Sequence, residues 1–260
     1  MHQPDQERLP GYLSAPPLAF AHRGGAERGD ENTTAAFERA VSMGYRYLET
    51  DVHATADGVV VVFHDDDTGR LLGRPGRIRD LRWADLATLR VAGSAVVPRL
   101  DEVLAGWPDV RFNVDIKDDP AVDPTVDLVR RSGATDRVLL ASFSTRRLVR
   151  VRTTFPTVAT SLGMREVVRL WFASRVGRGF AVPPSVVAAQ VPLRYRRVRV
   201  ADRRFLAHAH RLGLQVHVWT IDDPGTMGRL LDLGVDGIMT DRIEVLRDVF
   251  AARGVWPTTP

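Results

Sequence analysis

The chain has 260 residues, enough for one large domain or two small ones with a sizeable apolar core. It contains no cysteine, which excludes disulfides and thiolate metal sites. Its formal net charge of +4, from 36 basic and 32 acidic residues, permits binding to anionic surfaces without requiring it. Its first twelve residues do not resemble a secretory signal and no apolar span is long enough to cross a bilayer, so we expect a cytoplasmic protein.

Two residue types are rare enough to be informative. Lys117 is the only lysine, because every other basic side chain is arginine, and asparagine occurs only at Asn32 and Asn113. Two of these three rare residues fall within the five-residue stretch 113–117. Such clustering favours a functional role for that stretch.

The first unit of the chain has a strand, loop and helix pattern. Residues 18–21 form a short apolar run that predicts a strand with His22 at its C-terminal end. Apolar residues then recur at helical spacing over 36–43. Either Asn32 or Thr33 is suited to cap the start of this helix.

The second predicted strand brings two acids together. Glu49 and Asp51 share one face, because successive side chains of a strand point to opposite sides. The apolar run 59–63 follows a turn, and the resulting hairpin returns His64 towards both acids. Two carboxylates beside an imidazole suggest Mg²⁺ or Ca²⁺ with a proton-transfer group, whereas the simpler interpretation is a solvated edge strand.

A third group of polar residues lies on the next strand. After a polar connection with a short helix over 81–89, a further helix begins near Pro98. The stretch 111–117 alternates like a strand and places Asp115 and Lys117 on one face. A third carboxylate thus arrives with the lone lysine beside it.

The rest of the chain repeats strands and helices. We predict strands at 138–143, 158–162, 188–191, 215–219 and 237–240, and helices at 145–152, 165–176, 201–212, 224–233 and 243–252. Eight strand units in about 250 residues predict a single-domain (β/α)8 TIM barrel of the α/β class, with a short insertion after the second strand. We place the barrel at 18–252, between an N-terminal extension (1–17) and a C-terminal tail (253–260).

An open, doubly wound sheet is the competing architecture. It predicts a glycine-rich G-x-G-x-x-G loop after the first strand, and the His-Arg-Gly-Gly sequence that starts at His22 does not match it. In a barrel, the active site lies at the C-terminal ends of the strands. Many polar side chains fall there, which favours an enzyme: His22, Glu49, Asp51, Asp115, Lys117, Ser142, Gln190, Trp219 and Asp241.

The order of several short motifs resembles the glycerophosphodiester phosphodiesterase family between about residues 18 and 250. Each motif alone is weak, but their order and spacing are specific. They are His22-Arg23-Gly24, Glu31-Asn32-Thr33, Glu49-Thr50-Asp51, Asp57-Gly58, His64-Asp65, Asp115-x-Lys117, His217-Val218-Trp219-Thr220 and Gly237-Ile238-Met239-Thr240-Asp241.

This resemblance implies a role for each candidate residue. It makes His22 and His64 the catalytic acid–base pair, Glu49, Asp51 and Asp115 the ligands of a Mg²⁺ or Ca²⁺ cofactor, and Arg23 and Lys117 phosphate-facing cations. These roles suit a phosphodiester, because a metal and flanking cations stabilise the negative charge that grows in the transition state. The family often has glutamate at the position of Asp115, so a water-bridged contact from this shorter side chain is an alternative to direct ligation.

The other histidines and one aromatic residue have more general explanations. We expect His53 to support the acids rather than react, and His217 to pack or form hydrogen bonds inside the barrel. We expect His208 and His210 to lie on the surface of a helix or to pack against it. Trp219 lies at a strand end, and the resemblance favours a contact with substrate over simple packing.

The segment 165–204 is rich in arginine and aromatic residues, with acids only at Glu166 and Asp202. The simpler interpretation is a helix and a long loop with solvated arginines. The alternative is a rim that makes peripheral contact with an anionic membrane or a lysolipid tail. No nucleic-acid-binding motif is visible, so we expect no nucleic-acid partner.

The resemblance thus implies a metal-dependent phosphodiesterase that acts on small glycerophosphodiesters and yields glycerol 3-phosphate and an alcohol. A lysophospholipase D or sphingomyelinase-D-like enzyme on the same scaffold is the nearest alternative. A non-catalytic module that binds phosphodiesters or lipids is a second, although retention of both histidines and the early acids argues against it.

Overall fold

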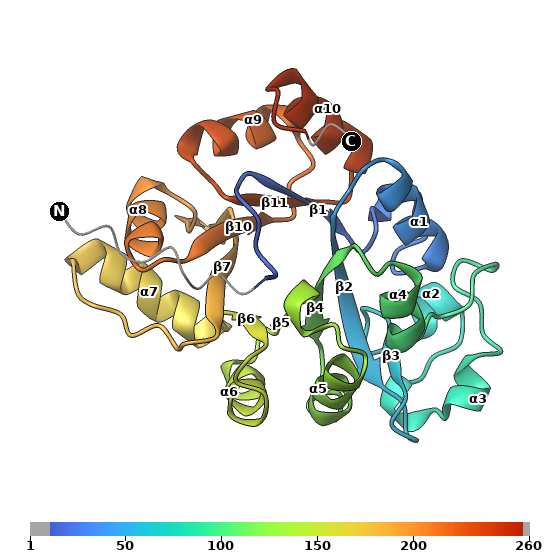
Figure 1. Ribbon diagram of the computed structural model, residues 1–260. Helices are drawn as coiled ribbons and strands as arrows, with labels where there is room; N and C mark the ends of the chain where they lie inside the picture. Colours follow the sequence, from blue (N-terminus) through green and yellow to red (C-terminus); the bar gives the residue numbers. More distant parts are fainter. Residues whose placement is uncertain (1–10, 257–260) are drawn as a thin grey trace.

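The structure, a computed structural model, describes residues 11–256. Within this range, parallel strands close into an eight-stranded barrel that is surrounded by helices (Figure 1). Pairing of β1 with both β11 and β2 closes the barrel. Its strands, in spatial order, are β1 (Leu18–His22), β11 (Gly237–Thr240), β10 (Gln215–Trp219), β7 (Val186–Pro192), β6 (Ala159–Ser161), β5 (Val138–Ala141), β4 (Arg111–Ile116) and β2 (Tyr47–Ala54). The predicted (β/α)8 barrel is therefore confirmed.

The strand register sets the predicted site residues side by side. His22 of β1 pairs with Glu49 of β2, and Asp51 of β2 pairs with Asp115 of β4. These strands are parallel, so their C-terminal ends meet at one end of the barrel. Three acids and one imidazole from distant parts of the sequence are thereby brought to a common face.

Two apolar clusters hold the barrel together. One fills its interior and includes Phe20, Tyr47, Leu139 and Met239. The larger one lies between the strands and the outer helices. Those helices are α1 (Thr34–Ser42), α4 (Leu100–Gly106), α5 (Val122–Arg131), α6 (Thr145–Thr154), α7 (Met164–Val176), α8 (Arg203–Arg211), α9 (Pro224–Leu233) and α10 (Ile243–Ala252).

Side-chain caps explain where several helices begin. The hydroxyl of Thr33 accepts a hydrogen bond from the backbone N–H of Ala36, which fixes the start of α1. Thr33, rather than Asn32, is therefore the cap. Ser144 and Asp202 cap α6 and α8 in the same way.

The expected insertion follows β2. It contains β3 (Val60–Val62), which pairs antiparallel with β2, and the short helices α2 (Gly69–Leu72) and α3 (Trp83–Leu86). A separate apolar cluster that includes Phe63 and Leu86 stabilises it. The insertion therefore forms a small packed unit beside the barrel (Figure 1).

Helix α2, helix α5 and part of the region after α7 were not predicted. Helix α5 was missed because its sequence opens with acids and Pro124, which are typical of a loop. Pro124 is tolerated because it lies in the first turn, where its missing N–H has no partner to lose. Part of the expected long loop after α7 is instead a short hairpin of β8 (Arg194–Tyr195) and β9 (Val198–Arg199).

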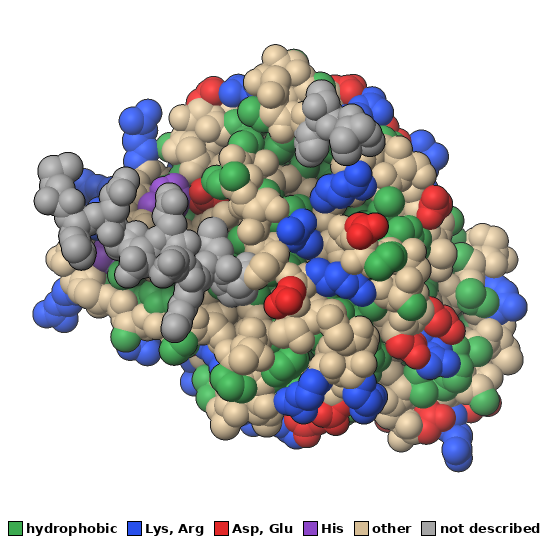
Figure 2. Space-filling model, viewed as in Figure 1, with side chains coloured by type: hydrophobic (Ala, Val, Ile, Leu, Met, Phe, Trp, Pro, Cys, Tyr) green, Lys and Arg blue, Asp and Glu red, His purple; other side chains and the backbone are tan. Residues whose placement is uncertain are grey.

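The segment before β1 runs across one end of the barrel (Figure 1). Tyr12 is fully buried there, and the hydroxyl of Tyr47 donates a hydrogen bond to its carbonyl oxygen at 2.9 Å. The predicted extension (1–17) and tail (253–260) lie partly outside the described residues. Figure 2 shows basic and acidic side chains interspersed on the face that it views. In the described part of the chain, no helix has the length and apolar character needed to span a membrane.

His217 gives the fold a pH-dependent stability. Its ring is fully buried, 4.8 Å from that of Phe20, and bonded to Gln215 at 3.0 Å. Burial lowers the pKa of His217 to about 4, from 6.5 for an ordinary histidine. The pKa of His217 is lower in the folded chain than in the unfolded chain, so the uncharged ring stabilises the fold. This stabilisation is complete above pH 6.5 and is lost as pH falls through about 4.

We expect the loss to be about 3 kcal/mol of unfolding free energy over that pH range. Urea unfolding at a series of pH values measures it, and His217→Gln should flatten this part of the profile. An unchanged slope in the variant would show that another group is responsible. The slope is the test, so a general loss of stability in the variant does not obscure it.

Candidate active site

All eight predicted site residues line one cavity of about 220 Å³ at the C-terminal end of the barrel. Their side chains come from β1, β2, β4, β10 and the loops that follow β1, β3 and β4. The other lining residues are both polar and apolar. The predicted set is His22, Arg23, Glu49, Asp51, His64, Asp115, Lys117 and Trp219.

A tight turn after β1 positions His22 and Arg23. Gly24 has a φ of +79°, and a Cβ there would lie 2.9 Å from atoms of Ala36 and Phe37, so only glycine fits. Arg23 itself adopts a left-handed conformation, with φ of 53°. This conformation lets its backbone N–H donate to Glu49 at 3.1 Å.

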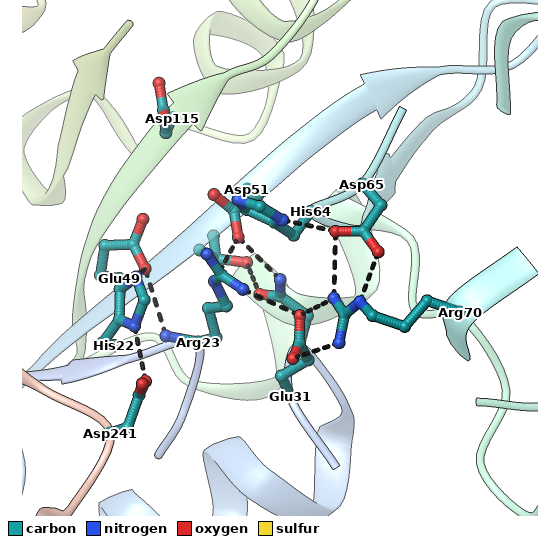
Figure 3. Close-up of polar contacts among 12 residues, drawn as sticks. His22, Arg23, Glu31, Glu49, Asp51, His64, Asp65, Arg70, Asp115 and Asp241 are labelled. Carbon is teal, nitrogen blue, oxygen red and sulfur yellow. Dashed lines mark hydrogen bonds and ion pairs between the residues drawn. The ribbon is translucent and has the colours of Figure 1, made fainter. Parts of the chain in front are cut away.

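His22 is held between two carboxylates. Its Nδ1 lies 2.6 Å from Oδ1 of Asp241, and its Nε2 lies 3.7 Å from Oε2 of Glu49 (Figure 3). Burial alone would lower the pKa of His22, but these two acids outweigh burial and raise it. The protonated form of this imidazole is therefore favoured.

His64 also bonds to a carboxylate, but its pKa is shifted in the opposite direction to that of His22. Its Nδ1 lies 2.6 Å from Oδ1 of Asp65, which is also bonded to the guanidinium of Arg70 (Figure 3). Burial, together with the charges of Lys117 and Arg23, lowers the pKa of His64 despite its acidic neighbours. The site therefore contains one imidazole biased towards the charged form and one towards the neutral form.

Glu49 and Asp51 are buried beside each other and titrate differently. Burial and the charge of Asp51 raise the pKa of Glu49 to about 7. Burial would also raise the pKa of Asp51, but the cations Lys117 and Arg23 lower it. Nδ2 of Asn32 further donates to Asp51 at 2.9 Å, so Asp51 is the better stabilised anion.

Lys117 occupies the space between two acids. Its ammonium nitrogen lies 2.6 Å from Asp51 and 2.7 Å from Asp115. The second carboxylate oxygen of Asp115, Oδ1, is buried without a hydrogen-bond partner in the described chain. A buried carboxylate oxygen without a partner, in a cavity shared with Glu49 and Asp51, has the donor chemistry that Mg²⁺ or Ca²⁺ requires. The residues present therefore fit a divalent cation.

A second acidic group adjoins the cavity. The side-chain oxygen or nitrogen atoms of Glu31, His64 and Asp65 lie within 4.8 Å of one another. Among residues 11–256, this is the only group of at least three His, Asp or Glu side chains that lie so close together. The guanidinium of Arg70 forms ion pairs with both Glu31 and Asp65. Arg70 therefore offsets the negative charge of this group, as Lys117 does for Asp51 and Asp115 inside the cavity.

The supporting residues follow the sequence expectations in most cases. His53 is buried and bonded to Asp118 at 2.9 Å and to the carbonyl oxygen of His64 at 3.2 Å, so it braces the hairpin. Trp219 lines the cavity, with its ring 5.4 Å from that of Phe143.

Four partnerships in this network were not foreseen from the sequence. Asp241 and Asp65 belonged to recognised motifs, but their pairing with the two histidines was not foreseen. Arg70 gave no signal, because it is one of many arginines in a polar loop of the insertion. Asn32 was indicated by the scarcity of asparagine and by the Glu31-Asn32-Thr33 motif, but its bond to Asp51 was not foreseen.

One end of the barrel presents two imidazoles, three carboxylates and two cations to one cavity, a set of groups suited to the cleavage of a phosphodiester. The sequence from residue 22 to 245 matches the model of the glycerophosphoryl diester phosphodiesterase family. This chain belongs to that family.

Individual relatives agree with this assignment. The chain is 40% identical over 244 residues to "Probable glycerophosphodiester phosphodiesterase 2" of Mycobacterium tuberculosis, covering 92% of each sequence. It is 28% identical to a human lysophospholipase D, covering 95% of this chain and 88% of the relative.

Solved structures share the fold. A glycerophosphodiester phosphodiesterase from Agrobacterium tumefaciens matches with a TM-score of 0.75 at 22% identity, covering 90% of this chain and 99% of that one. An Oleispira antarctica phosphodiesterase, solved with its product sn-glycerol-3-phosphate, matches with a TM-score of 0.75 at 21% identity, covering 91% and 97%.

Proposed function

We propose that this enzyme hydrolyses glycerophosphodiesters to sn-glycerol 3-phosphate and an alcohol, in a metal-dependent reaction with His22 and His64 as the acid–base pair. One observation carries the proposal: each imidazole has its Nδ1 held at 2.6 Å by a carboxylate, Asp241 or Asp65. Such a bond orients the ring and leaves Nε2 to exchange a proton with a reactant.

The two histidines divide the proton transfers. One takes the proton from the attacking oxygen as the phosphorus–oxygen bond forms, and the other gives a proton to the departing alcohol. The attacking oxygen belongs either to water or to the substrate's own glycerol hydroxyl, which would give a cyclic phosphate before water enters. The pKa of His22 is raised and that of His64 is lowered. These shifts suit a pair that begins the reaction with one imidazole protonated and the other neutral.

The cations of the site hold the phosphate. Arg23 and Lys117 supply two positive charges at the cavity wall. A bound Mg²⁺ or Ca²⁺, held by Glu49, Asp51 and Asp115, supplies a further charge against the oxygens that become more negative in the transition state. Trp219 offers an aromatic face to the glycerol or alcohol portion of the substrate.

The relatives support this substrate class. The Oleispira antarctica phosphodiesterase was solved with sn-glycerol-3-phosphate, which is the product that we propose here. The similarity to a human lysophospholipase D supports lysophospholipids as a second candidate substrate class, in which the same bond to the alcohol is cleaved. We also propose that residues 18–252 form a single catalytic domain.

Hydrolysis of glycerophosphocholine, followed by ³¹P NMR, tests the proposal. We expect glycerol 3-phosphate to appear with free choline, and a transient cyclic phosphate if the glycerol hydroxyl attacks first. The His22→Ala/His64→Ala double variant, purified in parallel, controls for contaminating activity. Phosphocholine as the product, or no turnover of any glycerophosphodiester or lysophospholipid, would overturn it, and binding without turnover would instead indicate a non-catalytic module.

A further inference from the structure

Four exposed apolar side chains form a continuous strip that starts at the cavity, which we term the apolar rim: Phe143, Met164, Val168 and Phe172. Their exposed fractions are 50%, 41%, 45% and 60%. Met164, Val168 and Phe172 follow one another at intervals of four residues along α7, so they lie on one face of that helix. Exposed apolar groups arranged in this way mark an interaction surface more often than isolated ones do.

The apolar rim is continuous with the active site. Phe143 and Met164 both line the cavity. The backbone N–H of Met164 donates to the carbonyl oxygen of Phe143 at 3.0 Å, and the ring of Phe143 packs against that of Trp219. A substrate with a long apolar tail can therefore place its phosphate in the cavity and its tail along the apolar rim.

Basic side chains flank the apolar rim. Arg165 and Arg169 are exposed next to it on α7, and neither forms an ion pair with any residue from 11 to 256. The acid between them in sequence, Glu166, is buried and paired with Arg152, so it does not offset their charge at the surface.

A second basic element extends from the same end of the barrel. The β8–β9 hairpin follows β7, whose last residue, Pro192, lines the cavity. Exposed Tyr195 sits in this hairpin among Arg194, Arg196 and Arg197, which likewise have no acidic partner within the described chain. This basic, aromatic composition differs from the face in Figure 2, where charges of both signs alternate.

We propose that the apolar rim and the β8–β9 hairpin dock on an anionic phospholipid bilayer and present the cavity to lysophospholipid head groups in it. Apolar side chains would enter the boundary of the acyl chains while the arginines contact lipid phosphates, which is how basic amphipathic surfaces bind membranes. The unpaired arginines identify an anionic lipid surface as the occupant rather than a neutral apolar partner. The hydrolysis step rests on the phosphodiesterase function proposed above, whereas docking does not.

Sedimentation with phosphatidylcholine vesicles, with and without phosphatidylglycerol, tests docking directly. We expect binding only to the anionic vesicles, and weaker binding at high salt. The Val168→Ser/Phe172→Ser double variant and Arg169→Glu should each lower vesicle binding about tenfold or more. None of these three residues lines the cavity, so hydrolysis of soluble glycerophosphocholine should be unchanged.

Val96→Ser and Arg131→Glu are matched controls, because both residues are exposed and neither lies on α7 or the hairpin. They should bind vesicles like the wild type. Hydrolysis of lysophosphatidylglycerol in the anionic vesicles should fall only in the α7 variants. Failure of the wild type to bind anionic vesicles, or equal binding by wild type and α7 variants, would overturn docking. Vesicle binding without hydrolysis of any substrate would overturn the phosphodiesterase function and leave docking supported.

Discussion

Replacing His22 or His64 with alanine is expected to lower the turnover number for glycerophosphocholine by about 10²- to 10⁴-fold while the barrel stays folded. In the proposed mechanism, each change removes a group that transfers a proton in the transition state. The Michaelis constant should change little, because the proposed phosphate-binding groups, Arg23, Lys117 and the metal, are kept in both variants. Steady-state kinetics and thermal unfolding of each purified variant measure both effects.

Three further variants sharpen this test. Asp241→Asn and Asp65→Asn keep the imidazoles but remove the charges on their Nδ1 atoms, so we expect smaller losses of turnover than in the alanine variants. His210→Ala is a matched control, because this histidine pairs with Asp236 on the outside of α8, away from the cavity. Turnover within a few-fold of wild type in His22→Ala or His64→Ala would reject the acid–base role of that residue.

Removing divalent cations should lower the rate of hydrolysis by at least about a hundredfold, because a metal ion supplies several kcal/mol of charge stabilisation. Dialysis against EDTA followed by titration with Mg²⁺ and Ca²⁺ measures the loss and identifies the ion that restores activity. Glu49→Gln should abolish most of this restoration. Equal rates before and after EDTA would contradict metal dependence.

Asp115→Asn provides a graded comparison. Asp115 shares Lys117 with Asp51, and its other carboxylate oxygen has no partner within residues 11–256. Because Lys117 already offsets the charge of Asp115, and because this shorter side chain allows a water-bridged contact, we expect Asp115→Asn to raise the concentration of metal needed for half-maximal activity by less than Glu49→Gln does. An unchanged requirement for metal would remove Asp115 from the metal site.

The amphipathic pattern of the helices and the apolar runs of the strands specify the barrel locally. Each of these elements buries one face, so its apolar residues recur at the spacing typical of a helix or a strand. Helix α5 was not predicted, because its acids and Pro124 are typical of a loop. Its short apolar stripe is formed by Val122, Val126 and Val129. The position of His22, Glu49, Asp51 and Lys117 near one end of the barrel was also accessible from the sequence, because the C-terminal ends of parallel strands lie at the same end of a barrel.

The partnerships within the site depended on the tertiary structure. His22 and Asp241 are 219 positions apart and meet only because β1 and β11 are neighbours in the closed barrel. Arg70 reaches Glu31 across 39 positions because the insertion packs beside the barrel. Residue spacing carries no information about such contacts, which arise when separate elements are packed together. The sequence alone therefore determined the barrel and its polar strand ends, whereas tertiary packing decided which acid holds His22 and where Lys117 places its charge.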